Sequence, residues 1–455
     1  MPESFPHANG RAEPWDLVTI GFGPSGLALA VALEEADMRN RSLFLEQKGE
    51  FSWHEGMLLE GARIQVSCLK DLATLRNPRS RFTFLNYLKS VGRLDEFVNM
   101  ATLRPTRLEF NDYLRWVARE LCSSVTYSTP ASAVEPVTGA DGEIVALDVT
   151  AFSLERNRVE HHLARNLVLA AGARPKAPEG LELAGSERVF HSNEFLQRIA
   201  ARFADRECEH HFLVVGDGQS GAEVFDFLAA RYPRAHVSAA TRGIGYRAKD
   251  ETPFVNEAFF PSAVDIFHHL SEAKRASILA SLRNLNYGVV DRELIDRIYR
   301  RVYDAKVAGE RTLEIRPFLE FRSASDTGAG VVVEFDDQLG DRTVRLEPDA
   351  VVLATGYAVP SQHPLLAKLS VHLEVDTAGR YRLDRDYRIR SREGFWPGIF
   401  LQGYAEETHG ISDTLLSLAS MRAWEICTSV RESIEAGERR HALPPENGPV
   451  AAGGA

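Results

Sequence analysis

The most informative residues of this chain form the run Gly21-Phe22-Gly23-Pro24-Ser25-Gly26, in which three glycines recur with the spacing GxGxxG. The apolar stretch Leu17–Ile20 precedes this run, and a segment rich in alanine and leucine follows it. In a strand–loop–helix unit of this kind the glycines permit a tight turn, close approach of the backbone to a pyrophosphate, and close packing of helix on strand. An acid about 20 residues further on should bind a ribose hydroxyl. Glu46 and the adjacent Gln47 follow the apolar stretch Ser42–Leu45 and fit that position.

A second run, Gly216-Asp217-Gly218-Gln219-Ser220-Gly221, repeats the pattern between apolar residues 212–215 and a helical segment at 222–230. After the next apolar stretch, residues 235–240, the expected acid is absent and Arg242 stands in its place. A cation there suits the 2′-phosphate of NADPH better than the free hydroxyl of NADH. An ordinary surface arginine is the alternative interpretation.

Two nucleotide loops in one chain predict electron transfer between two nucleotides, usually FAD on the first loop and NADPH on the second. A disulfide reductase would need a dithiol near the flavin, and the four cysteines, Cys68, Cys122, Cys208 and Cys427, form no CxxC. A Baeyer–Villiger or related flavin monooxygenase should carry an FxGxxxHxxx(W/Y/F) motif. The nearest stretch places His191 six residues after Gly185 instead of four, which argues against that class.

The composition is that of a soluble globular protein, with 44% hydrophobic and 26% charged residues. A length of 455 residues predicts two or three domains. The net charge of −11 argues against a nucleic-acid or anionic-membrane surface. No apolar run approaches the roughly 20 residues of a membrane-spanning helix, and the N-terminus has no signal-peptide core. With unpaired thiols and no metal-ligand spacing, we expect a cytoplasmic protein without a bound metal.

We therefore predict an α/β fold with two Rossmann-like dinucleotide-binding domains and a smaller helical insertion that binds the substrate. Residues 166–175 and 349–357 are apolar strands that end in glycine turns, as is common in flavoproteins with two nucleotides. The expected FAD-binding domain comprises residues 15–205 and 350–436, and the expected NADPH-binding domain comprises residues 206–349.

The helical insertion is expected at about residues 256–310, because residues 267–308 are charged and helical and interrupt the strand–helix alternation. Gly410 precedes an expected helix start at Ser412 and Asp413. The tails, residues 1–14 and 437–455, are polar or rich in proline, glycine and alanine, so we expect them to be disordered.

Several stretches resemble, in the same order along the chain, the flavin-dependent N-hydroxylating monooxygenases. These enzymes act on the side-chain amine of L-ornithine or L-lysine in siderophore and related pathways. The similar stretches are residues 51–57 (FSWHEGM), 64–78 (IQVSCLKDLATLRNP), 82–88 (FTFLNYL), 252–259 (TPFVNEAF), 286–287 (NY), 354–357 (ATGY) and 408–417 (THGISDTLLS). Such an ordered set covers nearly the whole chain and is far more specific than either glycine loop.

Lys70 favours the ornithine branch of this family, because that branch has a lysine after its Gln-Val-Ser-x-x stretch, which begins here at Gln65. The lysine-hydroxylating branch carries a different residue there and departs from the closing SDTLLS. The role of Lys70 is physically sensible. An ammonium at a fixed position can hold the α-carboxylate of a short diamino acid so that its terminal nitrogen reaches the flavin.

The resemblance also implies roles for other residues. Gln65 and Asn286 are the candidate catalytic residues: Gln65 would support the flavin, and Asn286 would orient the substrate amine. Asn256 and Ser417 complete the candidate substrate site, although each asparagine has the alternative role of a loop cap. Further expected FAD contacts are Gly21, Gly23, Pro24, Ser25, Gly26, Glu46, Gln47, Trp53 and His54, and further cofactor contacts are Gly216, Gly218, Gln219, Ser220, Arg242, Thr355, Gly356, Ser412 and Asp413. A core tryptophan and a surface histidine are the alternatives for Trp53 and His54.

The reaction implied by the resemblance is NADPH- and O2-dependent hydroxylation of L-ornithine to N5-hydroxy-L-ornithine through a flavin C4a-hydroperoxide. NADP+ would stay bound and shield the flavin. The amine must be neutral to attack, and an alkyl ammonium has a pKa of about 10.4, so we expect turnover to rise from about pH 6 to 9. L-lysine or a diamine as substrate, and a flavin-bound redox sensor, are the alternatives. Family resemblance further implies a homotetramer.

Overall fold

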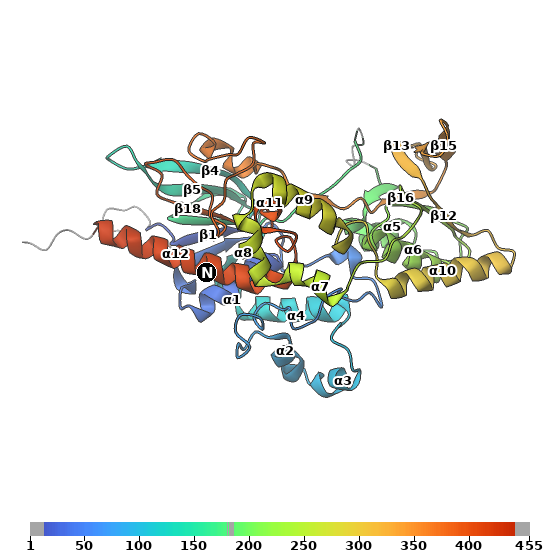
Figure 1. Cartoon of the computed structure of the whole chain (residues 1–455), viewed down its shortest axis with the longest axis horizontal. Coiled ribbons are helices and arrows are strands. Elements are labelled where there is room, and N and C mark those ends of the chain that lie inside the picture. Colours follow the sequence, from blue (N-terminus) through green and yellow to red (C-terminus); the bar gives the residue numbers. More distant parts are fainter. Residues whose placement is uncertain (1–12, 180, 182–185, 442–455) are drawn as a thin grey trace, which may run out of the picture.

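The structure is a computed structural model that describes residues 13–179, 181 and 186–441. It contains two five-stranded parallel sheets, one toward each end of the molecule (Figure 1). The first sheet has the order β18-β7-β1-β2-β3, and its strands are β1 (Leu17–Ile20), β2 (Ser42–Leu45), β3 (Val125–Thr126), β7 (Asn166–Leu169) and β18 (Gly398–Leu401). The second has the order β12-β11-β10-β16-β9, and its strands are β9 (Val189–His191), β10 (His211–Val215), β11 (His236–Ala240), β12 (Leu313–Arg316) and β16 (Ala350–Leu353).

The two glycine loops follow β1 and β10. On either side of each of these strands the strand order of the sheet continues in opposite directions. β1 pairs with β2 on one side and with the much later β7 on the other. β10 likewise pairs with β11 and with β16. Open α/β sheets bind ligands in the crevice beyond the carboxyl ends of such strands. Both loops therefore lie where a dinucleotide is expected.

The helix after the first loop, α1 (Pro24–Glu35), is buried from Gly26 to Leu33. It is apolar on all sides because it packs in the core with the long C-terminal helix α12 (Ala419–His441) and with α4 (Arg107–Glu120). The smaller helices α2 (Phe84–Ser90) and α3 (Leu94–Asn99) lie beside α4 (Figure 1).

Alternate residues of β10 face opposite sides of the second sheet, as expected for a strand. Phe212 and Val214 pack against the helices α5 (Phe195–Arg202), α6 (Gln219–Arg231) and α10 (Arg292–Val307). Leu213 and Val215 pack against the antiparallel sheet β13 (Leu319–Asp326), β14 (Val331–Asp337) and β15 (Thr343–Leu346). A second antiparallel sheet, β4 (Ala131–Thr138), β5 (Ile144–Ser153) and β6 (Arg158–Ala164), packs on the first domain. Neither antiparallel sheet is predicted by the sequence analysis.

The two domains are joined by two crossing segments that pair with each other. β8 (Arg174–Pro175) leads into the second domain, β17 (Tyr357–Ala358) leads out of it, and the two are antiparallel. Because β9 and β16 both belong to the second sheet, the boundaries expected at residues 205 and 350 lie inside the second domain. That domain begins after β8 and ends at β17.

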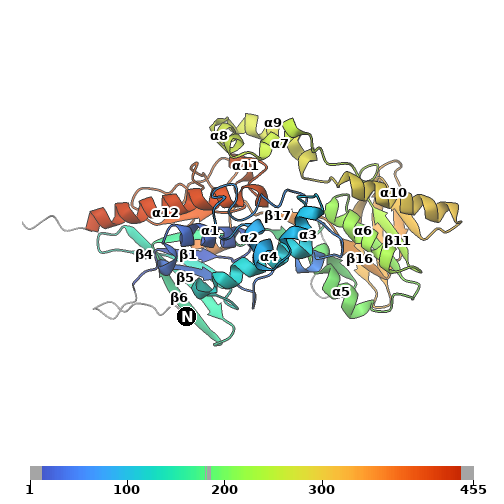
Figure 2. The same ribbon diagram turned by 90° about the horizontal axis from the view of Figure 1, so that it is seen from below.

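The helical region also differs from its prediction. α10 packs on α6 and β12 and so belongs to the second domain, where it continues the strand–helix alternation. The helices that leave this domain are α7 (Pro253–Asn256), α8 (Pro261–His269) and α9 (Glu272–Leu282). α8 and α9 pack on α11 (Glu406–His409) of the first domain (Figure 2). The insertion therefore ends near Asn286, well short of residue 310.

Two corrections apply to the C-terminal part. Ser412 and Asp413 lie in a turn, and α12 begins only at Ala419. α12 continues to His441, so the tail expected from residue 437 starts as helix. The remaining tail residues, 1–12 and 442–455, lie outside the described residues.

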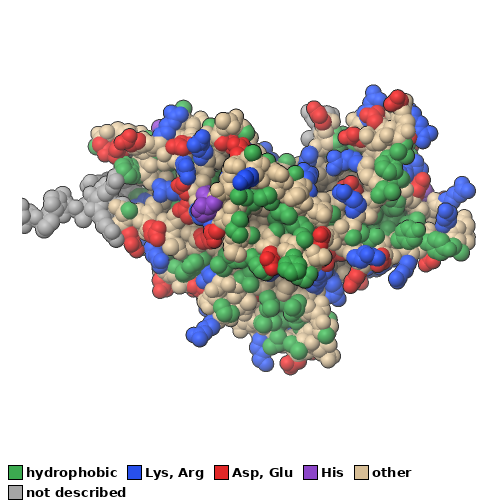
Figure 3. Space-filling model, viewed as in Figure 1, with side chains coloured by type: hydrophobic (Ala, Val, Ile, Leu, Met, Phe, Trp, Pro, Cys, Tyr) green, Lys and Arg blue, Asp and Glu red, His purple; other side chains and the backbone are tan. Residues whose placement is uncertain are grey.

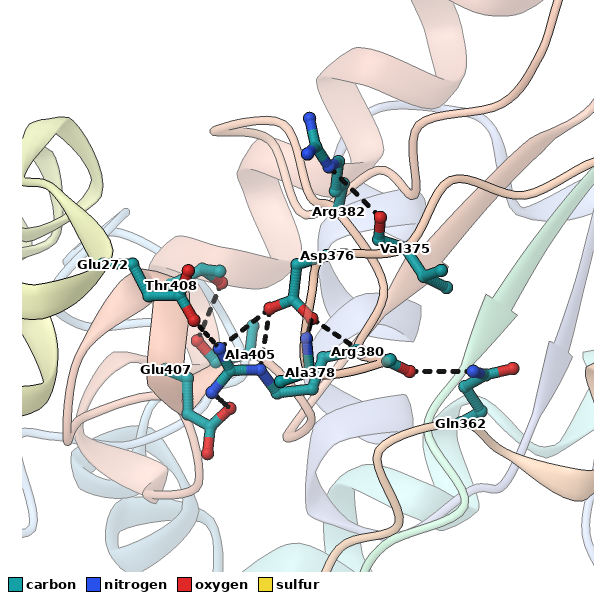
Figure 4. Close-up of polar contacts among 11 residues, drawn as sticks. Glu272, Gln362, Val375, Asp376, Ala378, Arg380, Arg382, Ala405, Glu407 and Thr408 are labelled. Atoms are coloured by element: carbon teal, nitrogen blue, oxygen red, sulfur yellow. Dashed lines mark hydrogen bonds and ion pairs between the residues drawn. The ribbon is translucent and has the colours of Figure 1, made fainter.

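Two arginines of the first domain, Arg380 and Arg385, bind carboxylates of the insertion, and Figure 4 shows the contacts of Arg380. Arg380 binds Asp376 in its own turn (Nε to Oδ2, 2.8 Å) and Glu407 of α11 (Nη1 to Oε2, 2.6 Å), and it also reaches Glu272 at the start of α9. Arg385 binds Asp265 of α8 at 2.7 Å and Glu425 of α12 at 2.8 Å. α8 and α9 are thus each tied to the first domain by an arginine–carboxylate contact.

Candidate active site

The first glycine loop has the shape that its spacing predicts. Gly21 has a φ of +100°, and a Cβ there would lie 2.4 Å from the Ala170 carbonyl oxygen. A Cβ on Gly26 would lie 2.3 Å from the Gly21 carbonyl oxygen. Gly23, by contrast, faces open space, because no neighbouring atom of the described residues lies within 4 Å of an added Cβ. Gly21 and Gly26 are therefore required by packing, whereas Gly23 leaves room for a ligand.

Glu46 lies against this loop. Its buried carboxylate accepts hydrogen bonds from the backbone N–H of Phe22 (2.7 Å) and of Lys48 (3.0 Å). Each carboxylate oxygen keeps a further lone pair, so a ribose hydroxyl can still donate to it. The adjacent Gln47 is exposed.

The second loop repeats this construction. Gly216 has a φ of +142°, and its added Cβ would lie 2.3 Å from the Ala354 carbonyl oxygen. α6 begins directly after Gly218, so Gln219 and Ser220 occupy a helix N-terminus, a position suited to an anion. Arg242 is exposed just after β11 and forms no ion pair within the part of the chain that the structure describes. These features fit a dinucleotide with a free phosphate beside Arg242.

Trp53 and His54 lie near the crossing between the domains. The Trp53 ring is 5.8 Å from that of Phe110 and 5.0 Å from that of His54, and the His54 ring is 6.4 Å from that of Tyr357. The His54 ring is reached by solvent, yet it is surrounded by protein atoms, as a side chain in a cleft is. This burial, together with Arg107 and Lys48, lowers the pKa of His54 to about 4.

Thr355 and Gly356 lie at the same crossing and bind Lys176. The Thr355 hydroxyl donates to the Lys176 carbonyl, and the Gly356 carbonyl accepts from the Lys176 N–H at 2.9 Å. The Gly356 carbonyl is also 2.9 Å from Nε2 of His191. These contacts give Thr355 and Gly356 a role in the domain connection, beside the cofactor role that the sequence predicts.

Gln65 and Gln219 meet at one carboxylate that the sequence analysis did not single out. Nε2 of Gln65 donates to Oδ1 of Asp291 at 3.3 Å, and Nε2 of Gln219 lies 3.5 Å from Oδ2 of the same residue. Gln219 also donates to Glu223 at 2.9 Å, and Glu223 pairs with Arg107. A continuous series of polar contacts therefore links Gln65 and Arg107 of the first domain through Asp291, Gln219 and Glu223 of the second.

Lys70 is half-buried and forms no ion pair with any described residue. Its Nζ lies 5.7 Å from the ring centroid of Phe259, a residue of the insertion. The pKa of Lys70 is lowered by burial and by the nearby cation Lys249. An ammonium without a carboxylate partner is chemically suited to pair with an anion.

The other predicted substrate residues surround the same region. Phe259, Leu285 and Ile411 form one apolar cluster that joins the insertion to the loop before Ser417. Asn256 lies three residues before Phe259, and its amide donates to the Glu251 carbonyl at 3.0 Å, a contact typical of a loop cap. Asn286 directly follows Leu285. Ser417 is buried, and its hydroxyl has no hydrogen-bond partner in the structure.

Several known proteins that are similar to this chain in sequence and fold belong to one family. The sequence profile described as L-lysine 6-monooxygenase/L-ornithine 5-monooxygenase matches residues 13–359. An L-ornithine N(5)-oxygenase from Arthrobotrys oligospora is 39% identical over 93% of this chain and 89% of its own. The chain belongs to this family. The family assigned from the ordered motifs is thereby confirmed.

Solved structures of the family have the same fold. The ornithine hydroxylase PvdA from Pseudomonas aeruginosa superposes with a TM-score of 0.87 at 35% identity, over 93% of this chain and 100% of the other. The ornithine N-hydroxylase KtzI from Kutzneria sp. 744, whose structure is titled with reduced FAD, NADP+ and L-ornithine, has a TM-score of 0.87 at 38% identity, over 92% and 99%. The predicted α/β fold with two dinucleotide-binding domains is confirmed, and FAD and NADPH are the family's cofactors.

Within this family fold, Arg422 is a further residue that sequence reasoning missed. It is buried in α12, and its guanidinium donates to the carboxylate of Asp413 at 3.2 Å and to the hydroxyl of Ser25 at 3.2 Å. Asp413 also accepts from the Ala405 N–H at 2.6 Å. Arg422 thus connects the first glycine loop to the closing SDTLLS stretch. A buried arginine has no local sequence signal, because nothing nearby in the chain identifies its partners.

Proposed function

We propose that this protein hydroxylates the side-chain amine of L-ornithine, using NADPH and O2, to give N5-hydroxy-L-ornithine. One oxygen atom of O2 enters the new N–O bond, and the other leaves as water, with two electrons from NADPH. The ornithine enzymes among its relatives support this substrate. The product would serve siderophore or related hydroxamate biosynthesis.

The observation that carries the proposal is the unpaired Lys70 ammonium beside Phe259. A diamino acid has an α-carboxylate at the end opposite to its reacting amine. Binding that carboxylate at Lys70 would fix the distance from the anchor to the reacting nitrogen. Diamines lack this carboxylate, so Lys70 would discriminate against them.

The amine end requires polar groups that leave its lone pair free. The buried Ser417 hydroxyl, which has no hydrogen-bond partner among the described residues, can accept one amine hydrogen. Asn286, which adjoins the same apolar cluster, would orient the amine. Asn256 would hold the amino-acid end together with Lys70. Each of these assignments extends the family resemblance to a particular side chain.

The two cofactors fit the two glycine loops. FAD would lie on the first loop, at Gly21, Gly23, Pro24, Ser25 and Gly26, with Glu46 at its ribose; NADPH would lie on the second, with Arg242 at its 2′-phosphate. When bound, the flavin takes up a hydride and activates O2, which no side chain can do. Gln65, Trp53 and His54 would line the flavin and exclude water. Gln219 and Ser220 would hold the dinucleotide in place.

The deciding experiment measures hydroxylamine, not NADPH oxidation, with FAD, NADPH, O2 and a panel of L-ornithine, L-lysine, putrescine and cadaverine. We expect product from L-ornithine only. Product mainly from L-lysine or a diamine would contradict the ornithine assignment; relatives titled as lysine and cadaverine monooxygenases make this a real test. No hydroxylamine from any amine would favour the flavin-bound redox sensor.

We further propose a cytoplasmic homotetramer. The insertion exposes large apolar side chains, among them Phe254 (87% exposed) and Ile266 (68%), and Figure 3 shows hydrophobic side chains gathered over this part of the molecule. Such surfaces mark protein contacts. Light scattering after size exclusion should give four chains per particle. Within the described residues, no helix combines the length and apolar content needed to cross a bilayer.

A further inference from the structure

Asp291 occupies the N-cap position of α10, yet its carboxylate does not cap the helix. Aspartate is a preferred N-cap because its side chain can accept from the free N–H groups of the first turn. Here the carboxylate instead accepts from Gln65 at 3.3 Å and from Gln219 at 3.5 Å. The side chain therefore makes no capping hydrogen bond to its own helix. It binds instead two residues that are 226 and 72 positions away in the sequence.

These contacts determine the orientation of both glutamine amides. An ionised carboxylate only accepts hydrogen bonds, so each glutamine must present its NH2 group to it. The Gln219 carbonyl oxygen accepts from the backbone N–H of Asp291 at 2.9 Å. Both the oxygen and the nitrogen of the Gln219 side-chain amide therefore have hydrogen-bond partners.

The rest of the junction is arranged to hold Asp291 in this place. Gln219 is held from its other side by Glu223, which is in turn bound by both terminal nitrogens of Arg107. Burial raises the pKa of Asp291, and Glu251 raises it further, whereas Gln65, Lys249 and Arg104 lower it. Burial of this carboxylate therefore carries a desolvation cost, which the glutamine amide and the nearby cations offset only in part.

We propose that Asp291 is a positioning residue that aligns Gln65 and Gln219, and that it thereby sets how firmly the enzyme retains NADP+ during turnover. This inference rests on the proposed function in one respect, namely that Gln65 lies at the flavin and Gln219 at the dinucleotide. In this role Asp291 acts on its two glutamine partners and not on the reacting atoms. Its effect passes through the two amides.

Two variants test this role. Asp291→Ser keeps a good N-cap residue but is too short to reach the glutamines. Asp291→Asn keeps the shape, and its single amide oxygen can accept from only one of them. Glu293→Gln is the matched control, because it removes an exposed acidic charge from the same helical turn.

The primary measurement is the dissociation constant of NADP+ for the FAD-loaded, oxidised enzyme, by titration calorimetry. Loss of two hydrogen bonds should weaken NADP+ about tenfold in Asp291→Ser, with Asp291→Asn in between and Glu293→Gln unchanged. The peroxide share of the NADPH consumed should rise in the same order, at unchanged melting temperature and unchanged KM for L-ornithine.

Wild-type affinity for NADP+ in Asp291→Ser would overturn the proposal. So would a weakening shared by Glu293→Gln, or a parallel loss of melting temperature and ornithine affinity, since either would mean a general disturbance of α10. If the wild-type enzyme bound NADP+ but made no hydroxylamine, the proposed function would fail, and the binding comparison would still decide the role of Asp291.

Discussion

Arg107 and Glu223 form a two-pronged ion pair between the two dinucleotide-binding domains. Nη1 and Nη2 of Arg107 lie 2.8 and 2.9 Å from the two carboxylate oxygens of Glu223. Arg107 is the first residue of α4 in the first domain, and Glu223 lies in α6 of the second. The two side chains are only 13% and 6% exposed, so this ion pair across the domain boundary is largely shielded from solvent.

Breaking this pair should destabilise the protein strongly. Glu223→Gln would leave the Arg107 guanidinium buried without its counter-charge, at a cost of about 3–5 kcal/mol in the free energy of unfolding. Chemical denaturation monitored by fluorescence would measure this. The exposed pair Arg345–Glu347 provides the control, and Arg345→Gln should cost less than about 1 kcal/mol. Equal effects of the two substitutions would contradict the importance of burial.

Lys70→Ala should weaken L-ornithine by about 2–5 kcal/mol, because the substrate carboxylate would lose its cation. The steady-state KM should rise accordingly, and NADPH oxidation should continue with more peroxide. Inhibition by putrescine, which has no carboxylate, should hardly change. The exposed insertion residue Lys274 is a matched control, and Lys274→Ala should behave as wild type. Unchanged ornithine affinity in Lys70→Ala would exclude the proposed carboxylate site.

Arg242→Ala should raise the KM for NADPH and leave that for NADH nearly unchanged, because only NADPH carries the 2′-phosphate. Loss of one charged contact corresponds to about 1.5–3 kcal/mol, or at least a tenfold change in preference. Arg300→Ala removes an exposed cation from the same domain and should leave the preference intact. Equal losses with both nucleotides would assign Arg242 a structural role.

The rate of the hydroxylation step should rise from about pH 6 to 9, because the fraction of neutral substrate amine rises over this range. His54 should not contribute, since its pKa of about 4 keeps it neutral throughout. Single-turnover measurements with pre-reduced enzyme separate this step from flavin reduction. His54→Asn should preserve the rise. A flat wild-type profile would contradict attack by the neutral amine.

His409 should make the protein less stable in acid. Burial and the neighbours His268, Arg385 and Arg422 lower its pKa to about 3 in the folded state, whereas the unfolded value is about 6.5. Between these values the unfolded state binds a proton that the folded state does not. Stability is therefore lost as the pH falls below about 6.5, by up to about 1.4 kcal/mol per pH unit.

His409→Phe should remove this contribution while keeping a ring against Tyr387, whose ring lies 4.1 Å away. Denaturation curves at pH 6, 5 and 4 should show a shallower pH dependence in the variant than in the wild type. The exposed His161 supplies the comparison, and His161→Asn should retain the wild-type slope. Identical slopes for all three proteins would show that His409 does not set the acid sensitivity.

The sequence by itself determined the features that depend on local sterics. The strands Leu17–Ile20 and Ser42–Leu45 have the predicted bounds, and both glycine loops have the predicted shape. A GxGxxG run between an apolar strand and a helix allows few other conformations. Lys70 and Ser417 could be selected because they lie in ordered motifs, and the fold places the Lys70 ammonium against Phe259 of the insertion.

The tertiary structure alone decided what depends on distant parts of the chain. β9 and β16 join the second sheet because parallel strands pair across long crossovers, and neither strand's sequence states which sheet it will enter. α10 returns to the second domain because its apolar face packs with α6. Asp291 resembles an ordinary N-cap in the sequence, and only the folded chain shows that its carboxylate lies between Gln65 and Gln219.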